Sequence, residues 1–193
     1  MNRKSLTAVA AAAVLAGGGA TASCASAATS QATTSQATTS QATTTGHSGT
    51  AHLMIWSLNS DGPYFQGIAT GAVGDYGKGE TVLPDGKVDP EHTSELQLNM
   101  THGSFRLSIA AIGKGVADSK RWQWNTSNCS GRVSFRAQAP IVAGSGTGAY
   151  RDITGTFSVT VTIEEVDVKP VCNGTSGFLS QIILLDGAGS VSY

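Results

Sequence analysis

The segment Gly144-Ser-Gly-Thr-Gly-Ala-Tyr-Arg-Asp-Ile-Thr-Gly-Thr-Phe157 joins two stretches in which apolar and polar residues alternate. Upstream, the apolar positions Val133, Phe135 and Ala137 alternate with polar side chains, and downstream the same alternation runs from Phe157 through Ile163. A period of two residues indicates β-strands. The glycines between the stretches can adopt positive φ, which a turn or bulge between antiparallel strands requires. We therefore predict a β-hairpin here.

Tyr150 is the one aromatic residue inside this glycine-rich segment. We expect its ring to pack over the turn and its hydroxyl to find a partner nearby. A phosphate-binding loop is excluded, because no Lys-Ser or Lys-Thr pair follows the glycines and the next element is a predicted strand rather than a helix.

The same residues resemble a known family. The pattern Gly-Thr-Gly-x-Tyr-x-x-Ile-x-Gly-x-Phe at 146–157 follows Cys-x-Gly at 129–131 and precedes a second cysteine. It is similar to secreted bacterial proteins with an allene oxide cyclase-like barrel, and to plant dirigent proteins. The resemblance covers roughly residues 70 to 193. It implies an all-β domain, a closed antiparallel eight-stranded barrel around an apolar cavity.

The N-terminal segment 1–27 has the features of an export signal: a basic start, an apolar run from Leu6 to Leu15 and small residues up to Ala27. Cleavage after Ala27 would release a soluble protein. Alternatively, Thr-Ala-Ser-Cys at 21–24 approximates a lipoprotein signal, which would leave Cys24 acylated and anchor the protein to the outer face of the bacterial membrane. Both routes predict a location outside the cytoplasm.

A linker is predicted at 28–49, because Ser-Gln-Ala-Thr-Thr occurs there three times in succession from Ser30 to Thr44. This segment has no charge in its repeats and no large apolar side chain, so it cannot bury enough surface to offset its ordering entropy. We expect a disordered tether, followed by one β-barrel domain at 50–193.

The cysteines predict one disulfide. Cys24 is either removed with the signal or lipidated, which leaves Cys129 and Cys172 as a pair in an oxidising compartment. Neither cysteine has a histidine at metal-ligand spacing, so we predict no metal site and no cofactor.

Composition favours a single all-β domain with few charges. The chain has 24 glycines and few apolar stretches with helical periodicity. Its formal net charge is −1, and removal of Arg3 and Lys4 makes it −3, which excludes a nucleic-acid or anionic-membrane footprint. A two-sheet sandwich is the alternative to a barrel, because alternation alone does not distinguish them. The predicted strands lie near 51–58, 66–74, 79–83, 94–100, 104–112, 120–126, 131–139, 155–166 and 177–192.

The first and last strands differ from the rest. Leu53–Leu58 and Phe178–Leu185 are apolar at both alternating positions, so both of their faces should be covered. In a barrel closed by pairing of its terminal strands, one face would line the lumen and the other would meet a loop, a helix or another subunit. Because the plant relatives are trimers, we predict self-association through these strands.

The candidate ligand-cavity residues are Trp122, Trp124, Arg136 and Tyr150. The two indoles could wall a cavity or form a sugar-binding platform, with core packing as the alternative, and a strand-borne arginine could meet a carboxylate. We find no residue pattern that identifies a catalytic centre. The sequence therefore favours a domain that binds a small apolar molecule in its lumen without covalent chemistry. The alternatives are an allene oxide cyclase-like cyclase or isomerase acting on a polyene or epoxide, and a structural cell-envelope interaction domain.

Overall fold

A computed structural model describes residues 46–58, 64–89, 94–170, 172 and 177–193. The predicted signal peptide, Cys24 and the repeats of the predicted linker lie outside these residues. The first strand begins at Ser48. The last two residues assigned to the linker therefore belong to the sheet.

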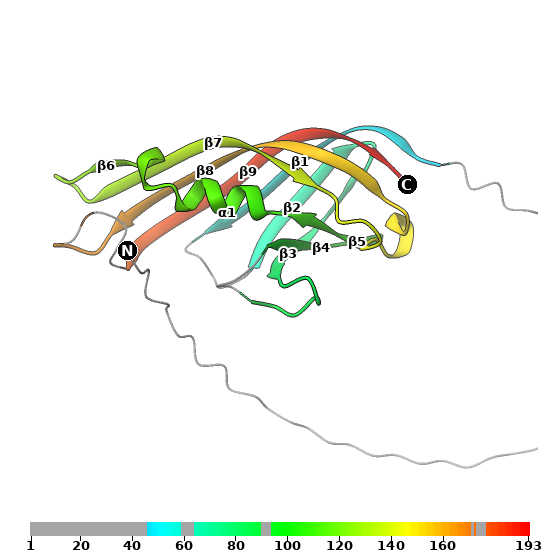
Figure 1. Cartoon of the computed structure of the whole chain (residues 1–193), viewed down its shortest axis with the longest axis horizontal. Helices are drawn as coiled ribbons and strands as arrows, with labels where there is room; N and C mark the ends of the chain where they lie inside the picture. Colours follow the sequence, from blue (N-terminus) through cyan, green and yellow to red (C-terminus); the bar gives the residue numbers. More distant parts are fainter. Residues whose placement is uncertain (1–45, 59–63, 90–93, 171, 173–176) are drawn as a thin grey trace, which may run out of the picture. The chain divides into compact units, whose positions relative to one another are not determined.

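The domain consists of nine antiparallel strands in one curled sheet, in the order β5-β4-β3-β2-β1-β9-β8-β7-β6 (Figure 1). The prediction of an all-β domain is confirmed, and each predicted strand range corresponds to an observed strand. Their bounds are β1 Ser48–Leu58, β2 Tyr64–Gly71, β3 Asp75–Val82, β4 Glu95–Met100, β5 Gly103–Ser108, β6 Gln123–Asn125, β7 Ser130–Pro140, β8 Thr154–Asp167 and β9 Phe178–Ser192.

The prediction of a closed eight-stranded barrel is wrong. The terminal strands do pair, because β1 and β9 are in register from Ser48↔Ser192 to Leu58↔Ile182, but they lie in the middle of the sheet. The sheet ends at β5 and β6, and no ladder joins these two edges. The result is a half-barrel.

The two sides of the half-barrel approach each other at one end only. A single bridge joins Leu107 of β5 to Ile141, just after β7. The glycine-rich segment then runs along β5: the Val142 amide donates to the Arg106 carbonyl at 2.8 Å, and the Thr147 amide donates to the Ser104 carbonyl at 2.8 Å. The predicted hairpin between β7 and β8 is thus present, and its connection holds the free edge of β5.

A helix that the sequence did not reveal follows β5 and packs on β7. Helix α1, Ala110–Ala117, packs on β7, with Ile112 and Gly115 buried (Figure 1). The apolar run up to Ile112 was assigned to the preceding strand. Alanine favours a helix, and packing against Phe135 supplies the contact that stabilises it.

The two glycines of α1 provide a matched test of this packing. A Cβ added at Gly113 meets nothing within 4 Å, whereas one added at Gly115 overlaps the Phe135 ring. We expect Gly113→Ala to stabilise the domain by about 0.5–1 kcal/mol, and Gly115→Ala to destabilise it by about 1–3 kcal/mol. Urea unfolding followed by circular dichroism measures both changes. Stabilisation by both variants would contradict the packing of α1 on β7.

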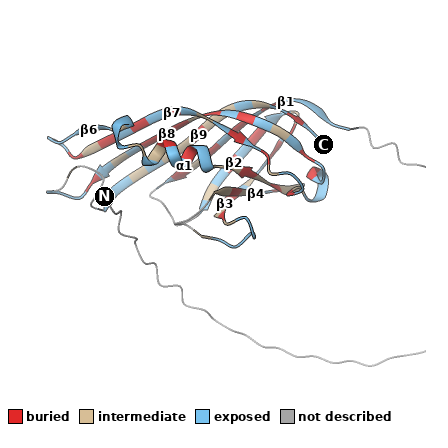
Figure 2. Ribbon diagram, viewed as in Figure 1, coloured by how far each residue is buried: buried red, intermediate tan, exposed pale blue. Residues whose placement is uncertain are grey.

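Burial alternates along the strands, so the sheet has a buried inner face and an exposed outer face (Figure 2). The inner side chains form one continuous apolar core. Its large fully buried members include Leu53 and Ile55 of β1, Phe105 of β5 and Phe157 of β8. The interior is therefore filled by side chains contributed from both arms of the half-barrel.

The predicted disulfide is present. Cys129, at the turn between β6 and β7, is bonded to Cys172, and their Cα atoms lie 4.5 Å apart. The bond ties the β6–β7 turn to the connection between β8 and β9. The amide of Asp167 donates to the Cys129 carbonyl at 2.8 Å and supports the same junction.

Candidate functional site

Trp122 and Trp124, two of the predicted cavity residues, are brought together near the β6 end of the sheet. Their rings stack, with centroids 5.3 Å apart and planes 13° apart. The indole of Trp122 donates to the Val116 carbonyl at 3.0 Å. Trp124 rests on Gly131 of β7, where a Cβ would overlap its ring. The indoles therefore cover each other, and Trp124 is among the residues around the groove described below.

The structure places the other two predicted residues elsewhere. Arg136 is exposed on the outer face of β7, in register with Thr160 of β8. Tyr150 is buried at the opposite end of the half-barrel, where its hydroxyl donates to Asp75 at 2.6 Å. Its partner is distant in the sequence, so the expectation of a nearby partner is wrong for Tyr150.

Asp75 is the most strongly bound charged group of the domain. Besides Tyr150, its carboxylate accepts from the amides of Tyr76 at 2.7 Å and His102 at 3.0 Å. Thr101 donates both its amide, at 3.3 Å, and its hydroxyl. The Asp75 side chain is 0% exposed. The carboxylate thereby fixes β3 to the β4–β5 turn and to the loop that carries Tyr150.

These contacts set the ionisation of the cluster. Burial alone would raise the pKa of Asp75, but hydrogen bonds from Thr101, Tyr150 and two main-chain amides outweigh it and hold this pKa well below its usual range. Burial, together with the hydrogen bond to Asp75, raises the pKa of Tyr150. Burial and the charge of Asp75 also raise the pKa of Tyr193, whose ring packs edge-on against Tyr150. The carboxylate is saturated with donors, so it anchors the fold and has no free oxygen for a substrate.

A groove with a volume of about 590 Å³ lies on the β6 side of the sheet. It is formed by three consecutive residues of each of four adjacent strands, together with Leu58 at the end of β1. Its wall combines exposed apolar side chains with paired polar ones. The lining residues are Leu58, Gln123, Trp124, Asn125, Ser130, Gly131, Arg132, Glu164, Glu165, Val166, Ser180, Gln181 and Ile182.

The polar side chains of this groove hold each other in place. On the outer face, Arg132 forms an ion pair with Glu164 at 3.2 Å. One residue along β8, on the inner side of the sheet, Glu165 accepts from the amide of Gln181 at 2.5 Å. Arg132 and Glu164 are also direct cross-strand partners. The groove therefore presents an apolar surface with donors and acceptors already oriented at its side.

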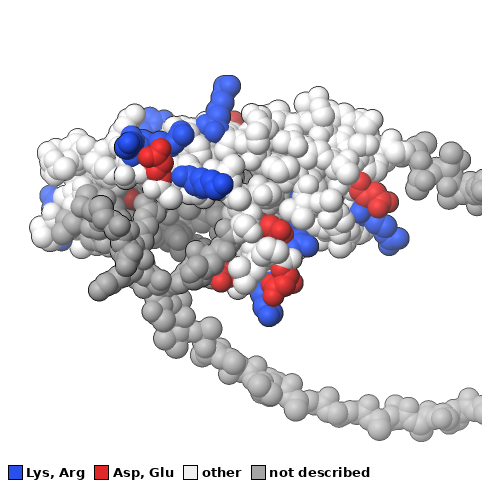
Figure 3. Space-filling view, viewed as in Figure 1, with Lys and Arg blue, Asp and Glu red and all other residues white. Residues whose placement is uncertain are grey.

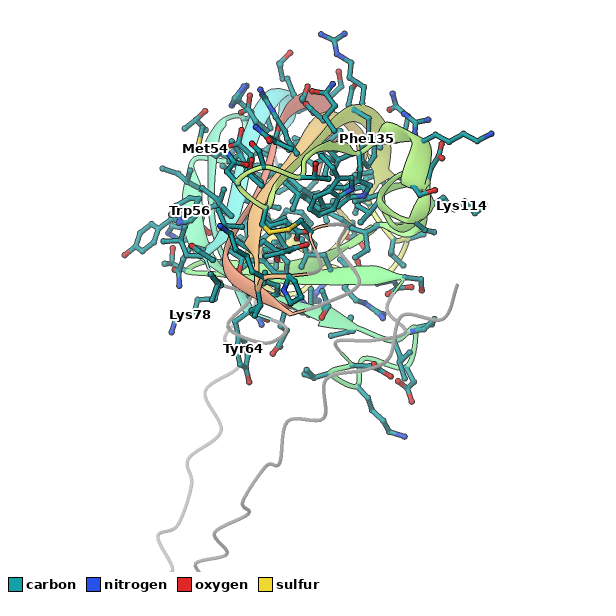
Figure 4. The ribbon with its side chains drawn as sticks, turned by 90° about the vertical axis from the view of Figure 1, so that its left-hand side faces the viewer. Met54, Trp56, Tyr64, Lys78, Lys114 and Phe135 are labelled. Carbon is teal, nitrogen blue, oxygen red and sulfur yellow. A yellow bond between two sulfur atoms is a disulfide. The ribbon has the colours of Figure 1, made fainter. Side chains whose placement is uncertain are left out.

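A second hollow, of about 280 Å³, lies on the same outer face across β2, β3 and β4. Tyr64, Lys78, Glu80 and Asn99 contribute its exposed side chains, and the Asn99 amide donates to Glu80 at 3.1 Å. The main chain at Gly77 and Gly79 also lines it. Figure 4 shows Met54, Trp56, Tyr64 and Lys78 along the outer flank of the sheet, whereas Phe135 points into the interior.

Charged side chains are few and mixed in sign. In the view of Figure 3, Lys and Arg lie in small groups beside Asp and Glu. Within the described ranges, no helix is long and apolar enough to cross a bilayer. In the same part of the chain, no three His, Cys, Asp or Glu side chains gather closely enough to hold a metal ion.

Comparisons with protein-family models, with curated proteins and with solved structures found no match to this chain. The resemblance stated for residues 129–157 accordingly stays a prediction. The groove is therefore interpreted from its own residues.

The sequence reasoning missed most of the groove. Alternation placed Arg132 and Glu164 beside the apolar positions of their strands, which was sufficient to assign them to the outer face. It could not show that they pair, because pairing depends on the register of β7 against β8. The sequence did not point to Asp75, because the two side chains that bind its carboxylate, Thr101 and Tyr150, lie 26 and 75 positions away.

Proposed function

We propose that this chain is a non-catalytic binding domain whose ligand lies in the groove on the β6 side of the sheet. One observation carries the proposal: the groove's volume of about 590 Å³ falls within the range of small-molecule sites. The apolar surface of Leu58 and Ile182 would bury the ligand, and the Arg132–Glu164 pair would orient it. Binding by such a site requires no change of covalent bonds.

The groove is a better candidate for the ligand-binding site than the lumen is. The sequence favoured a small apolar molecule inside the barrel, but the inner face is packed with side chains such as Phe105, Phe135 and Phe157. A ligand in that position would have to displace this core. The groove instead offers an open space with some apolar surface, and an amphipathic molecule matches its lining.

A cyclase or isomerase is supported less well. Such an activity needs an ionisable group that faces an otherwise apolar cavity. Asp75 is buried, but its oxygens are occupied by Tyr150, Thr101 and main-chain amides. Its perturbed pKa is explained by the fold and supplies no acid or base to a substrate.

We propose that the domain is located outside the cell, where it is either released or anchored to the membrane through Cys24. The basic start, apolar run and small residues of 1–27 support export, and the resemblance of residues 129–157 to secreted allene oxide cyclase-like proteins agrees with it. The intact mass of protein from the producing cells tests this. A chain beginning at Ala28 means release, an acylated chain beginning at Cys24 means anchoring, and a chain that retains 1–27 inside the cell contradicts export.

Binding in the groove can be tested with 8-anilinonaphthalene-1-sulfonate, an amphipathic fluorescent probe. We expect saturable fluorescence enhancement by the mature protein, weakened about fivefold or more in Ile182→Asn. Val88→Asn is the matched control, because Val88 is an exposed aliphatic residue outside the groove, 47% exposed against 39% for Ile182. Equal loss in both variants, or no probe binding by the parent protein, would contradict the proposal.

A further inference from the structure

One cross-strand row of outer-face side chains connects the two hollows. Antiparallel register joins Glu80 to Tyr64, Leu58 to Ile182, Ile182 to Glu164, Glu164 to Arg132 and Arg132 to Gln123. The β1–β2 ladder ends at Trp56↔Gln66, and its register counted two residues further aligns Leu58 with Tyr64. We call this row, from Glu80 to Gln123, the outer track.

The outer track has a hollow at each end. Glu80 and Tyr64 line the hollow of about 280 Å³ on β2–β4, and the track from Leu58 to Gln123 lines the groove of about 590 Å³. It crosses seven strands, which at about 4.8 Å per strand gives a length of roughly 29 Å. That length exceeds what a small molecule needs and corresponds to an extended polymer.

The outer track can bind a partner through side-chain groups, but few of its main-chain groups are available for hydrogen bonding. The amides and carbonyls of its inner strands are used in the sheet ladders, so a peptide could not add to the sheet here. Carboxylates, amides and a guanidinium remain, beside the phenol ring of Tyr64 and the aliphatic surfaces of Leu58 and Ile182. These groups match a chain of pyranose rings, whose hydroxyls both donate and accept and whose ring faces are apolar.

The charges on and beside the track balance. Glu80 and Glu164 are acidic, Arg132 and neighbouring Lys78 are basic, and Glu164 is paired with Arg132. The surface around the track therefore has no electrostatic potential of a single sign that would attract a polyanion or a polycation. The partner that fits is uncharged.

We propose that the outer track binds a linear, uncharged, β-linked polysaccharide, with about one sugar ring per strand. Successive strands lie about 4.8 Å apart, which is close to the length of one pyranose unit in an extended chain. Tyr64 stacks on one ring, and the Asn99–Glu80 and Arg132–Glu164 pairs bind hydroxyls at the two ends. This inference rests on the proposed function, because it extends the same groove and names the chemical class of its ligand.

Calorimetric titration of the mature protein with cello-oligosaccharides and chito-oligosaccharides tests the proposal. Affinity for at least one series should rise about tenfold or more from the trisaccharide to the hexasaccharide, because only the longer chain reaches both hollows. Maltohexaose, which coils, and oligogalacturonate, which is charged, should bind at least about tenfold more weakly.

Two exposed tyrosines of the outer face provide matched variants. Tyr64 on the track is 55% exposed, and Tyr76 on β3, outside the track, is 66% exposed. We expect Tyr64→Ala to weaken hexasaccharide binding about fivefold or more and Tyr76→Ala to change it less than about twofold. Because both side chains are exposed, both variants should fold, and urea midpoints verify this.

Three results would overturn the inference: no binding of any neutral β-linked hexasaccharide, equal affinity for trisaccharide and hexasaccharide, or equal losses in the two tyrosine variants. A dimer that Tyr64→Ala dissociates in light scattering would assign the face to a second copy of the chain instead. If the fluorescent probe still binds through Ile182, the inference on polysaccharide fails while the proposed binding groove stands. If the probe also fails to bind, both the polysaccharide inference and the proposed binding groove are wrong.

Discussion

Asp75→Asn is expected to destabilise the domain by about 3 kcal/mol at neutral pH. The carboxylate receives hydrogen bonds from Tyr150, Thr101 and two main-chain amides, and its side chain is fully buried. An asparagine amide would direct donor hydrogens toward these donors, so several buried groups would lose their partner. Urea unfolding at pH 7 measures the change.

The same variant should reveal a characteristic pH dependence. The pKa of Asp75 is lowered in the folded state, so its contribution to stability is fully present above the unfolded-state pKa of about 3.9 and decreases as the pH falls below that value. The difference in stability between parent and Asp75→Asn should therefore be larger at pH 7 than at about pH 2.

Asp85→Asn is the control for this experiment, because Asp85 is an exposed turn residue that bonds the Lys87 amide at 3.0 Å. It should shift the urea midpoint far less than Asp75→Asn does. If Asp75→Asn destabilised the domain as little as Asp85→Asn does, or by the same amount at pH 7 and pH 2, the Asp75 carboxylate would not be the anchor described here.

Removal of the disulfide is expected to have the other large effect. Cys129 and Cys172 close a loop with a sequence separation of 43, so the chain-entropy relation gives about 4 kcal/mol of stabilisation. The double variant Cys129→Ala/Cys172→Ala should unfold at correspondingly lower urea concentration. It also leaves the β6–β7 turn, beside the groove, without its covalent link to the β8–β9 connection.

Dithiothreitol gives an independent measurement of the same bond. The reduced parent protein should match the double alanine variant in its urea midpoint, and dithiothreitol should leave that variant unchanged. A parent protein whose midpoint is insensitive to reduction would contradict the stabilising role of the disulfide.

The sequence predicted those features that depend on local pattern. Alternation from Val133 to Ala137 and from Phe157 to Ile163 located β7 and β8, and it assigned the inner and outer faces correctly. Cysteine number, together with the predicted export signal, predicted the Cys129–Cys172 bond. These inferences need only the period of a strand and the chemistry of an oxidising compartment.

Features that depend on the register and curvature of the sheet could not be predicted in the same way. Closure of the barrel was inferred from resemblance, and helix α1 packs on β7 because Gly115 lets it approach Phe135. The outer track likewise exists only once seven strands are aligned, so no single segment reveals it. Asp75 and Tyr150 become partners through the same long-range pairing.

The position of the ligand on the outer face is the central claim, and amide chemical-shift mapping tests it most directly. During titration of the ¹⁵N-labelled mature protein with 8-anilinonaphthalene-1-sulfonate, the account predicts that the largest shifts lie at Ser130–Arg132, Glu164–Val166 and Ser180–Ile182. Shifts centred instead on the inner core around Phe135 and Phe157 would place the ligand in the lumen and contradict it.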